Sequence, residues 1–381
     1  MLHYAFLTFD SLGHVAGIVN LADKLLKIHP EIKVTVYVVC SIELKWGTTK
    51  IADNPIPGLN VVKFRLQPDG DNNASPFGYS LHNPKALAQD IMTAIQSDLP
   101  QQWPTLDLLA EQCNLARLHD GMLINDQEET YHPDYVSVIK NYLGNAWFIG
   151  YLPPLDTQAS RDEENPLFQW LDLQKPRSVI YIAVGTEASL GVADRVELAL
   201  ALEAVGCPVV WSLKKPKPYR PIHAEDDYKE REPAVSIDEY GLPEGWRERM
   251  KSRAMVMEWV PQIRTLSHLS TGLFISHCGW NSLSECISAA GIPILGLPMM
   301  TDQPMNADMM EKRLKIGQLL WESPTEGEIE RHTAATLIRQ VMNNEEFIKN
   351  AAHLKERNNE RFNVGSGTSM KRLDDFFNKA K

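Results

Sequence analysis

Short runs of β-branched and apolar residues alternate along the chain with stretches in which apolar residues recur at helical spacing. This alternation is typical of α/β domains built on parallel sheets. In the first half it predicts strands over residues 4–9, 33–39, 61–66, 121–125 and 147–149, with helices near residues 15–28, 84–97 and 103–112. In the second half it predicts strands over residues 178–184, 208–213, 254–258, 272–276 and 293–297, and a helical end over residues 326–381.

Two segments interrupt this pattern. Residues 151–166 (YLPPLDTQASRDEENP) combine prolines and charges without periodicity, which is typical of a linker. Residues 214–241 carry four prolines and many charges, and we expect a mobile surface excursion there. The predicted organisation is a first domain over residues 1–155, a second over residues 156–359, and a helical end over residues 360–381. Ligands of facing parallel-sheet domains bind beyond the carboxyl ends of the strands.

Composition excludes several classes of protein. The 381 residues are 44% hydrophobic, which excludes intrinsic disorder, and 38 Lys and Arg against 49 Asp and Glu give a net charge of −11. Such a chain has no broad basic field, so we do not expect a general nucleic-acid binder. No apolar run approaches the ~20 residues of a membrane span, and the first residues are interpreted as a strand, not a signal peptide. Five scattered cysteines (Cys40, Cys113, Cys207, Cys278 and Cys286) indicate a reducing compartment, by default the cytoplasm.

The most informative segment follows the predicted strand over residues 272–276. Gly279 predicts a tight turn, and the spacing of Ser282 and Glu285 is that of a capping box, so a helix is expected to begin near Asn281. The start of such a helix binds phosphate through its N–H groups and its dipole. With donors from His277, Asn281 and Ser282, the segment predicts a diphosphate site without Lys or Arg.

Two other interpretations compete at this segment. The first is an ordinary capped turn with a packed Trp280. The second is a zinc site formed by His268, His277, Cys278 and Cys286, but no pair among them has the short spacing that structural zinc sites use. We therefore expect no metal here.

The flanking segments favour a nucleotide-sugar site. Upstream, a predicted strand ends in Trp259 and Gln262, which can stack on a base and hydrogen-bond its edge. Downstream, another strand runs into Asp302 and Gln303, whose side chains supply acceptors and donors for adjacent sugar hydroxyls.

Together these residues match a known pattern. The matching positions are Trp259-x-Pro-Gln262, His268, Phe274, His277-Cys-Gly-Trp-Asn-Ser282, Glu285, Gly291-x-Pro293, Pro298 and Asp302-Gln303-x-x-Asn306. This set resembles the plant secondary-product signature of UDP-dependent glycosyltransferases, which are family 1 enzymes with the GT-B fold of two Rossmann-like parallel-sheet domains facing a central cleft. The segment from Ser178 to Gly185-Thr186 is similar to the family's diphosphate-contacting strand end. Residues 365–369 resemble the family's final helix, so the resemblance implies that the helix over residues 360–381 packs back onto the first domain.

The resemblance implies a role for each residue of the donor site. Trp259 stacks on uracil, and Gln262 and Glu285 hold the nucleoside. His277, Asn281, Ser282 and Thr186 hold the phosphates. Asp302 and Gln303 hold the sugar, and Trp280 borders it.

One departure lies inside the signature. Between Glu285 and Pro293 the chain carries one residue more than the usual pattern, which is expected to shift Asp302 and Gln303 slightly. Gln303 resembles the glucose-preferring version of the signature, so UDP-glucose is the first expected donor.

A candidate catalytic base lies near the amino end. His14 follows Gly13 just after the first predicted strand, a position presented to the cleft and not to the core. A lone histidine more often has a surface or capping role, but Gly13-His14 is similar to the family's general base. The resemblance thus implies an inverting transfer in which His14 deprotonates a small aromatic or lipophilic acceptor, with no metal or cofactor.

The first half departs further from the family. A block of more than one strand–helix unit, which normally supplies the Asp that orients the base and much of the acceptor pocket, has no counterpart. Asp120 and Asp126 are available substitutes, although a solvated loop carboxylate is the favoured interpretation of both. A weaker base favours acidic acceptors such as phenols. The shortened half also leaves open an alternative, a UDP-sugar-binding pseudoenzyme or regulatory subunit. The sequence does not determine the linkage type or the oligomeric state.

Overall fold

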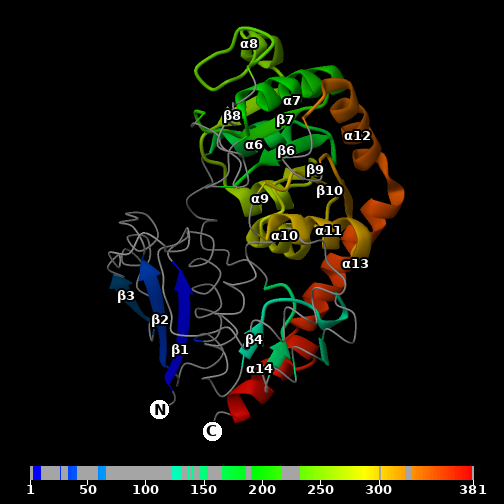
Figure 1. Ribbon diagram of the computed structural model, residues 1–381. Helices are drawn as coiled ribbons and strands as arrows, with labels where there is room; N and C mark the ends of the chain where they lie inside the picture. Colours follow the sequence, from blue (N-terminus) through cyan, green and yellow to red (C-terminus); the bar gives the residue numbers. More distant parts are fainter. Residues whose placement is uncertain are drawn as a thin grey trace. The chain divides into compact units, whose positions relative to one another are not determined.

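The computed structural model describes the chain in segments: residues 3–9, 26, 33–40, 59–65, 122–130, 136–137, 140, 146–152, 165–185, 190–216, 232–299, 302–321 and 328–379. The chain divides into two compact units (Figure 1). Unit 1 comprises residues 1–124, 131–149 and 371–381, and unit 2 comprises residues 125–130 and 150–370. The predicted linker falls largely in residues 153–164, which lie outside the described segments.

Unit 1 contains two parallel sheets. β1 (His3–Phe9), β2 (Lys33–Cys40) and β3 (Leu59–Arg65) form one sheet in that order. β4 (Met122–Ile124) pairs with β5 (Ala146–Phe148) in the other. The end of α14 (Thr368–Lys379) packs on the second sheet, where Phe376 meets the Trp147 ring edge-on at 5.2 Å.

Unit 2 is built on a six-stranded, entirely parallel sheet in the order β11-β10-β9-β6-β7-β8. Its strands are β6 (Val179–Ala183), β7 (Val209–Ser212), β8 (Ala254–Met257), β9 (Thr271–Ser276), β10 (Ile294–Gly296) and β11 (Gly317–Leu319). The chain runs outward from β6 to β8 on one side, then returns to β9 on the other. This is the doubly wound Rossmann order, with its switch point between β6 and β9.

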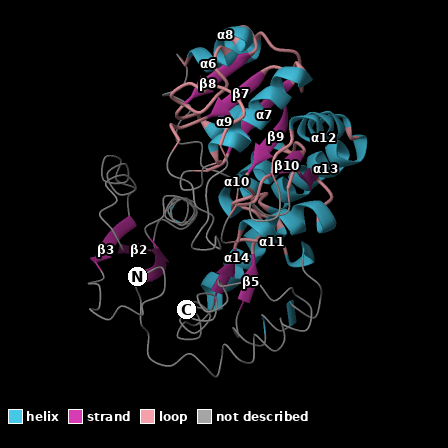
Figure 2. Cartoon of the chain, turned by 45° about the horizontal axis from the view of Figure 1, so that its top comes forward, coloured by secondary structure: helices cyan, strands magenta, loops and turns pink. Residues whose placement is uncertain are grey.

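Helices flank this sheet, as the cyan helices and magenta strands of Figure 2 show. The longer ones are α7 (Val192–Val205), α12 (Arg331–Asn343) and α13 (Glu345–Arg361). The shorter ones are α6 (Pro166–Asp172), α8 (Trp246–Met250), α9 (Gln262–Ser267), α10 (Trp280–Glu285) and α11 (Gln303–Asp308). Two π-helical turns, Cys286–Ala290 and Met309–Arg313, extend α10 and α11.

Two hydrophobic cores lie on the two faces of the sheet because side chains alternate along each strand. Ile180 and Ile182 face a core formed with α7, α8 and α12. Tyr181 faces the opposite core, formed with α6, α9, α10 and α13. Tyr181 therefore lies on the face that carries the start of α10.

Local caps explain where several helices begin. The Asn165 side chain accepts from Leu167 N ahead of α6, and Pro166 occupies the first helical position, where a missing N–H costs nothing. The Asn344 side chain accepts from Phe347 N at the start of α13. Glu330 accepts from His332 N and Thr333 N before α12, and these bonds lower the pKa of Glu330 to about 2.

All ten strands predicted from the hydrophobic pattern are confirmed to within two residues at each end. β11 was not predicted, because a three-residue strand with a central Gln318 gives no apolar run. The predicted helices near residues 84–97 and 103–112 lie outside the described segments, as does the helix near residues 15–28 apart from Leu26.

Candidate functional site

The loops that leave the switch point of unit 2 carry the predicted phosphate segment. β6 ends at Ala183 and runs into Val184 and Gly185, while β9 ends at Ser276 and runs into His277. Ala183 and Ser276 lie opposite each other in the parallel register. The two loops therefore start side by side, in the position where doubly wound sheets bind ligands.

α10 begins at Trp280, one residue before the predicted start. The capping-box prediction is wrong, because the N-cap is Gly279 without a side-chain cap and Ser282 is already the third helical residue. The helical ladder starts with Leu283 N–H donating to Gly279 O, so the backbone amides before Leu283 lie outside it. Residues 280–290 form one helical run, α-helical over Trp280–Glu285 and π-helical over Cys286–Ala290.

His277 is held between two glycines. A Cβ atom built at Gly185 would lie 2.7 Å from His277 Nε2, and one built at Gly279 would lie closer still, so the imidazole fits only against bare backbone. Burial lowers the pKa of His277 to about 4, opposed by the Ala183 carbonyl and by Asp302. The ring is neutral at physiological pH, and its Nδ1 is buried without a hydrogen-bond partner among the described residues.

Gln262 is the centre of a hydrogen-bonded cluster next to α10. Its Nε2 donates to Ser282 Oγ at 3.0 Å and to Glu285 Oε2 at 2.8 Å. Its Oε1 accepts from the Tyr181 hydroxyl at 3.1 Å. Burial raises the pKa of Glu285, while the bond from Gln262 opposes the shift. The structure thus brings three of the predicted donor-site residues together, and it adds Tyr181.

Trp259 follows β8 and is 51% exposed. Pro261 is the N-cap of α9 and Gln262 is its first residue. Trp259 therefore lies three residues before Gln262, at the point where the chain passes from β8 into α9. An exposed indole is unusual for a large apolar side chain, and it matches the predicted base platform.

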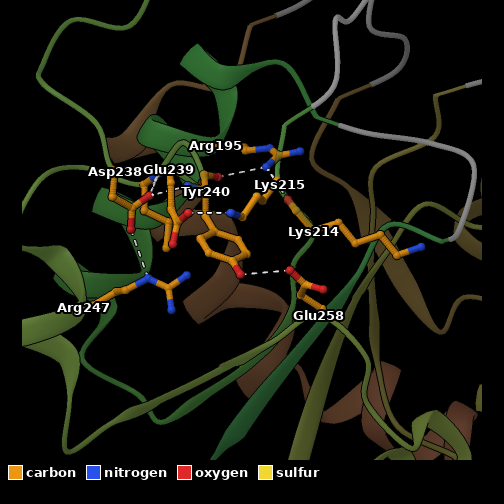
Figure 3. A network of polar contacts seen from close by, with 9 residues as sticks. Arg195, Lys214, Lys215, Asp238, Glu239, Tyr240, Arg247 and Glu258 are labelled. Carbon is orange, nitrogen blue, oxygen red and sulfur yellow. Dashed lines mark hydrogen bonds and ion pairs between the residues drawn. The ribbon is translucent and has the colours of Figure 1, made fainter.

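A polar network includes Glu258, the residue before Trp259 (Figure 3). The Tyr240 hydroxyl donates to Glu258 Oε1 at 2.9 Å, one residue before Trp259. The Arg247 guanidinium lies 4.6 Å from the centre of the Tyr240 ring, within cation–π range. Lys215 forms an ion pair with Glu239 across the same ring.

Arg195 of α7 fixes the backbone of this network. It is 3% exposed and donates to the carbonyls of Leu190, Lys214 and Tyr240. Both ends of the predicted excursion over residues 214–241 are thereby fastened to α7. Residues 217–231, the middle of that excursion, lie outside the described segments, so its mobility stays a prediction.

Asn306 links the predicted sugar-binding pair to the turn before α10. Its Nδ2 donates to Asp302 Oδ2 at 2.7 Å and to Cys278 O at 3.0 Å. Cys278 has a left-handed backbone with φ 60°, which is costly for a non-glycine residue and is held here by this bond and by one from its N–H to Ser276 Oγ. Asn306 therefore couples Asp302 to the strained turn.

Gln303 and Trp280 occupy more enclosed positions. Gln303 is 6% exposed, opens α11, and accepts from Met299 N through Oε1 at 2.9 Å. Trp280 is half-buried, and its ring centroid lies 5.7 Å from that of Tyr151. Trp280 is therefore packed, as the competing interpretation expected, but the helix that it begins has no side-chain cap.

The extra residue of the signature lies in the π-helical turn Cys286–Ala290. Gly291 N–H donates to Cys286 O, an i to i+5 bond that takes up one more residue than an α-helical turn. After the turn, Ile294 pairs with Phe274 in an undisturbed parallel register. β10 thus begins in regular parallel register after the turn, and the expected shift of Asp302 and Gln303 stays a prediction.

The remaining predicted residues are placed as follows. His14, Thr186 and Asp120 lie outside the described segments. Asp126 is described and is 2% exposed, with its Oδ1 accepting from Gln127 N, so the expectation of a solvated carboxylate is wrong for this residue.

No metal-binding cluster of three His, Cys, Asp or Glu side chains occurs among the described residues. His268 instead contacts Ser270 Oγ and Asp172 Oδ1. Cys278 and Cys286 are buried free thiols, and burial raises the pKa of each to about 12. In the part of the chain that is described, no helix is both long and apolar enough to cross a membrane.

Sequence reasoning missed Tyr181 as a member of the site. It lies in the middle of a buried strand whose other interior residues are apolar, and a phenol in that setting needs a hydrogen-bond partner. The need of a buried phenol for a hydrogen-bond partner was the one feature of the sequence that pointed to Tyr181. The partner, Gln262, could not be identified from spacing because 81 residues separate the two.

Comparisons with known proteins agree with this geometry. The family described as UDP-glucoronosyl and UDP-glucosyl transferase matches residues 140–361. UDP-glycosyltransferase 72D1 of Arabidopsis thaliana is 36% identical over 195 residues, 51% of this chain and 40% of that protein. Anthocyanidin 3-O-glucosyltransferase 7 of Manihot esculenta is 31% identical over 270 residues, 70% of this chain and 76% of that protein.

Solved structures agree on the fold. TcCGT1, crystallised in complex with UDP, superposes with a TM-score of 0.77 at 20% identity, covering 100% of this chain and 99% of that one. This similarity confirms the predicted GT-B class. The chain spans 40% to 58% of the length of the first curated relatives that it matches. The family match over more than half of the chain, together with the clustered signature residues, shows that this protein belongs to the UDP-glucoronosyl and UDP-glucosyl transferase family.

Proposed function

We propose that this chain transfers a sugar from a UDP-sugar, with UDP-glucose as the first expected donor, to a small aromatic or lipophilic acceptor. The observation that carries the proposal is the hydrogen-bonded cluster of Gln262, Ser282 and Glu285 on α9 and α10, with exposed Trp259 three residues before Gln262 in the chain. Family membership and the UDP and UDP-glucose complexes of fold neighbours support the donor.

The donor site would bind UDP without a cationic side chain. The amides of the first turn of α10 and the single N–H of neutral His277 would offer donors to the diphosphate. Such fixed dipoles stabilise the charge that develops on UDP as it leaves, so the proposed reaction requires no metal or other cofactor. Glu285, an acceptor-only carboxylate, suits the ribose hydroxyls, and Asp302 with Gln303 suits the sugar.

The proposed chemistry is an inverting displacement. His14 removes the proton of the acceptor hydroxyl, the oxygen forms a bond to the anomeric carbon, and the bond from that carbon to UDP breaks on the opposite face. Residues 1–155, with the helix over residues 360–381, would supply the acceptor side, and residues 156–359 the donor side. Cytoplasmic location, expected from cysteine usage, stays a prediction.

The test is UDP release with UDP-glucose and a panel of phenols and aliphatic alcohols. We expect turnover with phenols that His14→Ala abolishes while UDP binding survives. The matched control is His353→Ala, on the outer part of α13, which should keep full activity. UDP binding without sugar transfer to any acceptor would favour the pseudoenzyme or regulatory alternative instead.

A further inference from the structure

Tyr181 carries a buried hydroxyl that is committed to the donor site. The residue lies in the middle of β6 and is 1% exposed. Its ring stacks on Phe274 of β9, with centroids 5.2 Å apart and planes 6° from parallel. Its hydroxyl extends from this stack to Gln262 Oε1 at 3.1 Å. The ring therefore belongs to the core, while the oxygen belongs to the cluster beside α10.

The donor and acceptor roles in this chain of contacts are fixed. Burial raises the pKa of Tyr181, so the phenol stays protonated and donates to Gln262 Oε1. With its oxygen so engaged, the Gln262 amide presents Nε2 to Ser282 and Glu285. The flipped amide would place its oxygen 2.8 Å from a carboxylate oxygen, which is repulsive. The Glu285 carboxylate thus excludes the flipped amide, and the Tyr181 hydroxyl holds the remaining orientation through Gln262 Oε1.

The selected orientation sets the carboxylate of Glu285. Both Nε2 hydrogens are used, one by Ser282 Oγ and one by Glu285 Oε2. Glu285 Oε1 accepts no hydrogen bond from the described residues, and a carboxylate oxygen in that state suits a hydroxyl donor. The half-buried carboxylate of Glu285 is therefore held by one oxygen and can present the other.

We propose that Tyr181 is a positioning residue for the nucleoside of the donor, orienting Gln262 so that Glu285 presents its second oxygen to the ribose hydroxyls. This inference rests on the proposed function, which it deepens from UDP binding in general to discrimination at the ribose. The residue lies on β6, outside the signature segment that forms the rest of the site.

The experiment compares two nucleotides on the purified full chain. Calorimetry gives the Kd of UDP and of 2′-deoxy-UDP, which lacks one ribose hydroxyl. The variants are Tyr181→Phe, Gln262→Ala and the double variant. Tyr181→Phe keeps the ring stack, so the fold should be retained. The matched control is Thr271→Val, which removes another buried hydroxyl of the same sheet. This hydroxyl donates to Thr265 O and lies at the start of β9, whereas the proposed site follows the end of that strand.

The wild type should bind UDP more tightly than 2′-deoxy-UDP. We expect Tyr181→Phe to weaken UDP binding by about 3- to 10-fold, the range of one hydrogen bond, and 2′-deoxy-UDP binding by less than about 2-fold. Thr271→Val should leave the preference unchanged. In the Gln262→Ala background, Tyr181→Phe should add less than about 2-fold, because residues that act through one another are not additive.

Three results would overturn the inference alone, given UDP binding by the wild type. They are an unchanged ribose preference in Tyr181→Phe, full additivity in the double variant, and a retained preference in Gln262→Ala. The Gln262→Ala substitution does not alter the hydrophobic core. Its ribose preference therefore tests the inference even if Tyr181→Phe is unstable. Absence of UDP binding by the wild type would overturn the proposed function as well.

Discussion

The side-chain amide of Gln262 donates to the carboxylate of Glu285 at 2.8 Å, joining the first residue of α9 to the last residue of α10. Burial raises the pKa of Glu285, and this bond is the contact that opposes the rise. The two residues lie on the helices that follow β8 and β9, two strands on opposite sides of the switch point. Their pairing holds the base-side and phosphate-side loops of the proposed site together.

Replacing Gln262 with Glu tests that pairing. A second carboxylate at this position should repel Glu285 and weaken UDP binding by about tenfold or more at pH 8. At pH 5 the loss of UDP affinity should be smaller, because the two neighbouring carboxyl groups can then share one proton with each other and no longer repel. Calorimetric titration with UDP at both pH values measures the effect. A loss that is equal at both would contradict the pairing, and Gln318→Glu on β11 controls for added charge.

The amide of Asn306 provides a second test. Asn306→Ala removes its bonds to Asp302 and to Cys278 O, so the left-handed turn loses a support and the proposed sugar-binding carboxylate loses one hydrogen bond. We expect UDP-glucose binding to weaken about tenfold and UDP binding to weaken less. The control is Asn343→Ala, whose amide donates to Arg339 O within α12. Equal losses for both ligands would show that Asn306 supports only the fold.

His277 predicts a pH dependence of stability. Its pKa is about 4 in the folded protein, below the ordinary value of 6.5, so between these values the unfolded chain binds a proton that the folded chain does not. Stability should therefore fall as pH decreases from about 6.5 to 4, by an amount on the order of 1 to 3 kcal/mol. Urea unfolding of the wild type and His277→Gln at pH 7.5 and 5 measures this. Parallel losses in the two proteins would exclude His277 as the cause.

The π-helical turn predicts tolerance to a deletion. Removing Ala289 should convert Cys286–Ala290 to an α-helical turn and leave β10 in register, because the extra residue is absorbed before Gly291. We expect UDP affinity within about 3-fold of the wild type, at a stability cost on the order of 1 kcal/mol. Deleting Leu283 instead, in the core of α10, should abolish UDP binding. Loss of binding on deletion of Ala289 would show that the turn itself forms part of the site.

The sequence predicted the strands well because parallel strands buried on both faces are continuous apolar runs, as in residues 179–183. It also placed the donor segment, since a glycine turn after such a strand opens a helix. The capping box predicted from Ser282 and Glu285 is wrong because the same spacing also occurs inside a helix, where Ser282 accepts a hydrogen bond from Gln262.

Contacts made across the sheet could not be predicted. The bond from Tyr181 to Gln262 depends on the register of β6 against β9 and on where α9 begins. The same holds for Asn306 and Cys278, which meet only because β9 and β10 are neighbours. Spacing reveals residues on one element, whereas these pairs require the strand order.

The most direct test of the central claim is a crystal structure of the chain with UDP. We predict uracil against the ring of Trp259, ribose at Glu285, and the diphosphate at the backbone amides that precede Leu283, within reach of His277. UDP bound away from the start of α10, or those amides covered by protein in the complex, would contradict the proposed donor site.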